Sequence, residues 1–151
     1  MTESIKISPN DIIIGKLSHG CDLLEELTSI CVQKNISLGK IEAIGAVQKS
    51  CIGFYNQTSR EYHFLNFNKP SEILNLTGNI SIKENKPFVH AHILLADESG
   101  NAYGGHLAPG TIIFACEFVI HSYSGAELIR GMDDETGLPL WKINIDSGNR
   151  M

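Results

Sequence analysis

Apolar residues recur at helical spacing between positions 22 and 34. Five of them fall on one face of a helix: Leu23, Leu24, Leu27, Ile30 and Cys31. Asp22 stands where its side chain can accept hydrogen bonds from the first helical turn, and Glu25 can reciprocate. The pattern predicts an amphipathic helix that packs its apolar face on the core.

Elsewhere the pattern is mostly extended. Glycines interrupt it in two places, where they predict a tight bend within residues 36–49 and a bulge or bend at Gly78. Residues 111–120 form an almost continuous apolar run, which is typical of a central strand buried on both faces. Other short apolar or alternating runs bounded by turn residues predict strands over residues 4–7, 11–17, 51–55, 61–67, 73–76, 79–83 and 126–130.

Three of the six histidines lie between positions 90 and 106. Side chains of a strand over residues 88–95 alternate between its two faces, so His90 and His92 point the same way. Residues 97–101 have the composition of a turn, and a strand over 103–107 would return antiparallel to the first. This hairpin would bring His106 close to the other two imidazoles.

Three neutral imidazoles that converge on one point can hold a transition metal and leave a coordination position open for water or substrate. Zinc, iron, nickel and copper all accept such ligands, and zinc is our first expectation. Gly104 and Gly105 would leave room beside the third ligand. The alternative is that the histidines face solvent, or hydrogen-bond within the sheet and hold no ion.

Two carboxylates are candidates to act beside the histidines. Glu117 stands alone in the apolar run, where a buried carboxylate needs a partner. It could hydrogen-bond a metal-binding imidazole, pair with Arg130, or lie at a subunit interface. Either Glu117 or Glu72 could be a general base, although a carboxylate at the start of a strand, as Glu72 is, is often only solvated.

Other candidates have simpler interpretations. His19 precedes the predicted helix and is expected to be a solvent-facing loop residue. His63 lies on an apolar face of its strand and is expected to be a hydrogen-bonded core residue. That strand has no cleanly polar face, so its sheet should be covered on both sides or pack against another subunit. The acidic residues 133–135 lack the spacing of a calcium-binding EF-hand, which predicts a solvated turn.

The composition indicates a globular chain. Its 151 residues fit one domain, residues 1–151, and its apolar runs are shorter than a membrane helix requires. The N-terminus lacks the features of a secretory signal, so we expect a cytoplasmic protein. The four cysteines form no Cys-x-x-Cys pair and are expected to be free thiols.

The formal net charge is −5, and no two basic residues are adjacent in the chain. Proteins that bind DNA usually present a basic patch, because neutralising phosphates supplies most of their non-specific affinity. The charge therefore disfavours direct DNA binding.

Several motifs together resemble one known family, the PPC domain shared by plants and prokaryotes. In chain order they are residues 71–80, the Pro-Phe-Val-His-Ala-His-Ile run at 87–93, Gly-Gly-His-Leu at 104–107, Cys-Glu at 116–117, Thr-Gly-Leu at 136–138 and Leu-Trp at 140–141. The chain departs from the plant members in two respects. It has no AT-hook, and it reads Lys-Pro-Ser-Glu-Ile-Leu at 69–74, where plant members carry Gly-Arg-Phe-Glu-Ile-Leu.

The resemblance implies an α+β fold, with a largely antiparallel β-sheet and packed helices, assembled as a homotrimer. It also implies metal binding through His90, His92 and His106. The first hypothesis is therefore a trimeric protein with a three-histidine divalent-metal site, with or without an enzymatic activity on a small-molecule ligand. The second is a DNA-binding or regulatory module, and the third is an oligomeric scaffold without metal.

Overall fold

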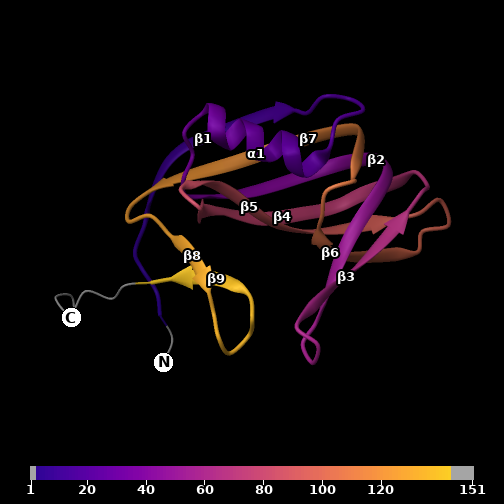
Figure 1. Cartoon of the computed structure of the whole chain (residues 1–151). Helices are drawn as coiled ribbons and strands as arrows, with labels where there is room; N and C mark the ends of the chain where they lie inside the picture. The colour runs from indigo at the N-terminus through magenta and orange to yellow at the C-terminus, as the bar shows by residue number, and fades with distance from the viewer. Residues whose placement is uncertain (1–2, 144–151) are drawn as a thin grey trace.

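The computed structural model describes residues 3–143, and within them it contains one helix and nine strands (Figure 1). The helix, α1 (Leu23–Gln33), confirms the helix predicted from the apolar spacing. Its N-cap Asp22 accepts hydrogen bonds from the backbone N–H groups of Leu24 and Glu25. The strands are β1 (Ser8–Lys16), β2 (Gly39–Asn56), β3 (Glu61–Phe67), β4 (Ser71–Lys83), β5 (Lys86–Ala96), β6 (Ala102–Leu107), β7 (Ile112–Ser124), β8 (Ile129–Met132) and β9 (Pro139–Lys142).

The predicted fold class, α+β with several helices packed on the sheet, is wrong. The described residues form a β-rich fold with a single helix. The physical reason is visible in the chain: outside residues 22–34 the apolar positions do not follow helical spacing, so they are buried by alternation across a sheet. The single domain and the homotrimer stay predictions.

The strands form one sheet in the order β1-β7-β2-β6-β5-β4-β8-β9, with β3 paired to β2. Every pairing is antiparallel except that of β4 with β8. The long strand β2 pairs with β4 and β7 along its first half and with β3 and β6 further on. Since β4 also pairs with β5, and β5 with β6, these four strands close into a ring.

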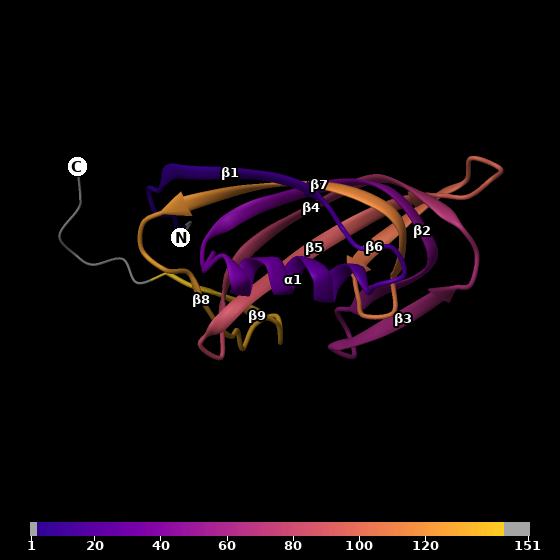
Figure 2. The same ribbon diagram turned by 90° about the horizontal axis from the view of Figure 1, so that it is seen from above.

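The helix covers one face of this sheet, where it contacts β5 (Figure 2). Its apolar side chains Leu23, Leu27 and Cys31 are fully buried in the core. Alternate residues of β5 from Val89 to Leu95 belong to the same core, so the residues between them point to the face away from α1. His90 and His92 are among these outward residues.

Several strand boundaries differ from the prediction. Residues 4–7 are not a strand, and β1 runs through Pro9 and Asn10 with a register shift. Proline is tolerated there because β1 is an edge strand that pairs only with β7. Both β2 and β4 continue through the glycines that were expected to interrupt them, although the register of β2 with β4 shifts between Ala43 and Gly45. The expected strand at 126–130 is β8, which begins later.

The apolar run 111–120 is buried on one face only, contrary to prediction. In β7 the side chains of Ile113, Cys116, Phe118 and Ile120 are buried, whereas Phe114 is 59% exposed. The face away from α1 stays open because no second helix covers it in the described part of the chain.

Between residues 3 and 143, no helix combines the length and the apolar character needed to span a bilayer. The cytoplasmic location stays a prediction.

Candidate metal centre

The structure brings the three predicted histidines together. His90 and His92 lie on β5, and His106 on β6 is directly opposite His92 in the antiparallel register. One ring nitrogen of each histidine lies within 4.8 Å of those of the other two. The ring centroids are 5.3 Å apart for His90 and His92, 5.1 Å for His90 and His106, and 5.8 Å for His92 and His106. Among residues 3–143, no other group of His, Cys, Asp and Glu side chains meets the same condition.

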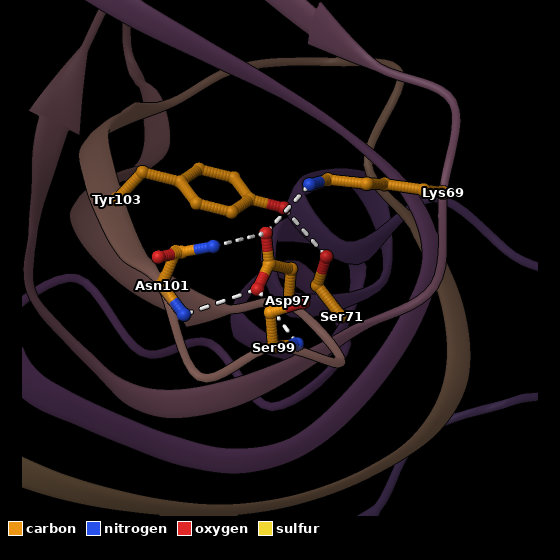
Figure 3. Close-up of polar contacts among 6 residues, drawn as sticks. All are labelled: Lys69, Ser71, Asp97, Ser99, Asn101 and Tyr103. Carbon is orange, nitrogen blue, oxygen red and sulfur yellow. Dashed lines mark hydrogen bonds and ion pairs between the residues drawn. The ribbon is translucent and has the colours of Figure 1, made fainter.

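The turn between β5 and β6 fixes the register that places His106 (Figure 3). The carboxylate of Asp97 accepts hydrogen bonds from the backbone N–H groups of Ser99 and Asn101, both at 3.0 Å, and pairs with Lys69 Nζ at 2.8 Å. The Lys69 ammonium, followed by the other donors, lowers the pKa of Asp97 to about 2. Next to it, the hydroxyl groups of Tyr103 and Ser71 are 2.5 Å apart, which ties β6 to the start of β4.

The two glycines before His106 have a different role from the one predicted. A Cβ atom on Gly105 would lie 2.7 Å from the carbonyl oxygen of Gly53, and one on Gly104 would contact the carbonyl oxygen of Ile93. Both glycines therefore allow the backbones of β2, β5 and β6 to approach each other, and the space of their missing side chains is filled by neighbouring strands.

The surroundings keep two of the imidazoles neutral. Burial, together with the nearby Arg130 guanidinium and the other two histidines, lowers the pKa of His90 to about 4. Burial also lowers the pKa of His106, with smaller effects of His92 and Arg130. Neutral imidazole is the form that binds a metal.

His106 Nδ1 is buried and has no hydrogen-bond partner. Buried polar atoms in proteins almost always have a partner, so an unpartnered nitrogen on one of three clustered imidazoles suits a metal ligand. The donor set therefore fits a divalent transition metal on its chemistry and on this atom.

Two further residues of the site were not predicted as site residues from the sequence. The ring of Tyr62 lies 5.0 Å from that of His106. Arg130 Nη2 donates to Asn79 Oδ1 at 2.7 Å, and Asn79 is opposite His90 in the β4–β5 register. Tyr62 lies on β3, and no signal in the sequence indicated which element its side chain meets.

Two hairpins flank the site. The β2–β3 and β8–β9 hairpins both project on the side of the sheet away from α1 (Figure 1). Tyr55 donates from its hydroxyl to the Thr136 carbonyl at 2.8 Å, and the Arg60 guanidinium donates to the carbonyls of Asp134 and Glu135. The acidic segment 133–137 is thus a turn, as predicted, and it docks on the β2–β3 hairpin.

The structure does not bring the two candidate carboxylates to the histidines. Glu117 lies opposite Ile44 on β2 and is exposed, so it is not a buried carboxylate that needs a partner. It forms no ion pair with Arg130. Glu72 is also exposed and lies opposite Ala96, beyond His92 along β5.

The other two histidines considered lie outside the cluster. His19 is exposed, with its Nδ1 2.7 Å from the carbonyl oxygen of Phe114. His63 is exposed as well, so the prediction of a core residue is wrong. The reason is that β3 pairs only with β2, and the described residues leave both of its faces largely uncovered.

Comparison with solved structures finds close likenesses over nearly the whole chain. A metal-containing protein from Archaeoglobus fulgidus is 37% identical with a TM-score of 0.90, over 94% of this chain and 100% of that one. A plant- and prokaryote-conserved (PPC) protein from Pyrococcus horikoshii is 28% identical with a TM-score of 0.89, over 95% and 99% of the two chains. A candidate DNA-binding protein from Bacteroides thetaiotaomicron is 29% identical with a TM-score of 0.82, over 90% and 96%.

Among curated proteins, the chain is 31% identical over 136 residues to the bifunctional protein GlmU from Synechococcus sp. (strain JA-2-3B'a(2-13)). That match covers 89% of this chain and 20% of the relative. The chain therefore spans about a fifth of the length of the curated relatives it matches.

The family model that matches is that of the Plants and Prokaryotes Conserved (PCC) domain, over residues 6–124. The match includes all three clustered histidines and most of the sheet that positions them. The chain belongs to the Plants and Prokaryotes Conserved (PCC) domain family.

Proposed function

We propose that the protein is a metal-binding protein in which His90, His92 and His106 hold one divalent ion. The observation that carries this proposal is the approach of the three ring nitrogens, with a buried His106 nitrogen that has no other partner. The metal-containing Archaeoglobus relative, 37% identical over nearly the whole chain, supports it.

Zinc is the ion we propose, because three neutral imidazoles suit it and leave a position for a further ligand. When bound, such an ion can polarise a carbonyl group or lower the pKa of a water molecule. The chain itself sets the state of the ligands. Burial and Arg130 favour neutral imidazoles, and the open side of the sheet keeps His92 exposed to solvent.

Metal analysis of the full chain, purified without an affinity tag, tests this function. We expect about one metal ion per chain, and a loss of at least tenfold in affinity for the His92→Ala variant, since it removes one of three ligands. His63→Ala is the matched control, because His63 is exposed and lies outside the cluster. Wild-type protein that binds no divalent ion after dialysis against zinc would contradict the proposal.

We also propose that the protein is a homotrimer, as the family resemblance implies. Exposed apolar side chains on the face away from α1, including Ile12, Ile14 and Ile44, support an interface there. Their exposed fractions are 67%, 74% and 58%.

The Bacteroides relative favours a second candidate function, DNA binding. A gel-shift titration with duplex DNA at several salt concentrations tests it. A DNA-binding module would keep its affinity for a preferred site near physiological salt. A protein with a net charge of −5 is expected to lose its affinity for DNA at that salt concentration.

A further inference from the structure

Arg130 carries a positive charge that no carboxylate neutralises in the described part of the chain. Its hydrogen bonds all go to neutral acceptors: Nε to Ser81 Oγ at 2.8 Å, Nη1 to the Pro139 carbonyl at 2.8 Å, and Nη2 to Asn79 Oδ1 at 2.7 Å. The ion pairs among residues 3–143 lie elsewhere. Burying part of an arginine without a counter-ion costs free energy, so this arrangement calls for an explanation.

The guanidinium is held in a fixed place beside the histidines. Its central carbon lies 5.3 Å from the ring centroid of Phe88 and 5.8 Å from that of Trp141. Its partner Asn79 is opposite His90 across the β4–β5 pairing.

The charge balance of the site is therefore positive. Three neutral imidazoles leave both charges of a divalent ion uncompensated, and Arg130 adds a third. The two carboxylates that were candidates for this site, Glu72 and Glu117, lie elsewhere on the sheet. No carboxylate in the described part of the chain supplies the compensating negative charge. An anionic ligand would supply it.

The guanidinium also retains hydrogen-bonding capacity. It has five N–H groups, of which three are used, and each terminal nitrogen keeps one N–H. A planar carboxylate presents two oxygens that accept such hydrogen bonds, and charge-assisted bonds of this kind are stronger than neutral ones.

We propose that Arg130 is the receptor for the carboxylate of a small anionic ligand that binds at the three-histidine site. This inference deepens the proposed function and depends on it for the ion, but it assigns a separate property, the chemical class of the ligand, to a separate residue. Tyr62, whose ring lies against that of His106, forms another wall of the same site.

The test uses acetate as the probe and inorganic phosphate for comparison, at constant ionic strength. In the cobalt-loaded full chain, we expect acetate to change the visible absorption spectrum saturably. The Arg130→Gln variant should weaken acetate binding by about tenfold or more, because it removes a charge-assisted hydrogen bond. Arg130→Lys keeps the charge but loses the planar pair of N–H donors, so its affinity for acetate should lie between those of wild type and Arg130→Gln.

Lys83→Gln is the matched control. The Lys83 ammonium lies 5.1 Å from the centroid of the same Phe88 ring, so its removal changes the local charge equally but leaves the Arg130 hydrogen bonds in place. We expect acetate binding within about twofold of wild type, the salt-screened effect of one nearby charge. Equal weakening by Lys83→Gln and Arg130→Gln would overturn the proposal in favour of general electrostatic attraction. Tighter binding of phosphate than of acetate would overturn the assignment of a carboxylate.

A second readout does not need the metal. In the metal-free chain, acetate should shift the NMR signals of the Arg130 Nη–H groups saturably in wild type and in Lys83→Gln. Absence of that shift, together with equal acetate binding by wild-type and Arg130→Gln cobalt proteins, overturns the role of Arg130. Protein that takes up no metal but still shows the shift would overturn the proposed function and leave the anion receptor standing.

Discussion

At the scale of single residues, the chemistry of the site follows from its surroundings. The His90 side chain points to the face of β5 away from the helix, yet its neighbours bury part of its ring and place Arg130 nearby. Burial and a like charge both disfavour the imidazolium form, so they act in the same direction on the pKa. Keeping His90 neutral lowers the free energy of unfolding only at a pH at which the same imidazole takes up a proton in the unfolded chain.

The metal-free protein should therefore lose stability as the pH falls. The pKa of His90 is about 4 in the folded chain and 6.5 in its ordinary state, so between these values the unfolded chain binds a proton that the folded chain does not. Relative to wild type, His90→Gln should remove up to about 2 kcal/mol of this loss between pH 6.5 and pH 4, allowing for solvent screening. Urea unfolding at a series of pH values measures it.

His63→Gln is the control for this series, since His63 is exposed. Parallel pH profiles for wild type and His90→Gln would show that His90 does not carry the effect. The comparison between variants matters because carboxylates such as Asp97 lose their own contribution only at lower pH, as the pH falls towards their depressed pKa.

At the scale of elements, the pairing of β4 with β5 positions His90. Gly78 is opposite Ala91, next to the Asn79–His90 pair, and a Cβ there would lie 2.5 Å from the His90 carbonyl oxygen. Real Cβ atoms do not approach a backbone oxygen so closely, and backbone has little freedom to move. The two strands can be adjacent at this point only because residue 78 has no side chain.

Gly78→Ala should push β5 away from β4 and disturb the first histidine ligand. We expect a loss of about 1 to 3 kcal/mol in the free energy of unfolding, the usual cost of forcing atoms into a packed region. Zinc affinity should fall as well. Asn75→Ala, at an exposed position on β4 opposite Leu94, should change both by much less. Chemical denaturation and zinc titration measure the two effects, and equal behaviour of the two variants would contradict the prediction.

At the scale of the whole molecule, the sheet is covered on one face only. The helix packs on that face. The other face exposes apolar side chains from β1 and β2, the two strands that flank β7. Exposed apolar patches of this kind mark interaction surfaces. The homotrimer proposed above gives this face a partner.

Ile14→Glu combined with Ile44→Glu should convert the trimer to monomer, because it places charges in an apolar interface. Light scattering coupled to gel filtration measures the mass. Val32→Glu, on the exposed side of α1 with 49% of its surface accessible, should leave the mass unchanged. A wild-type protein that is monomeric at micromolar concentration would contradict the trimer, and it would leave the metal proposal intact.

The sequence by itself determined the features that depend on local periodicity. The helix with its Asp22 cap followed from apolar spacing, and the shared face of His90 and His92 followed from the alternation of a strand. A short turn between two strands determined that His106 would return beside them, since a hairpin leaves few other registers. These relations join residues within one or two elements.

Only the tertiary structure decided which residues from distant parts of the chain lie beside the three histidines. Arg130 reaches the histidines because β8 pairs with β4, and Glu117 stays away because β7 lies on the other side of β2. The fold class was predicted wrongly because it was taken from the family resemblance, whereas the apolar spacing of the chain is helical only between residues 22 and 34. Long-range pairings close large loops, and their register is set by the packing of the whole sheet.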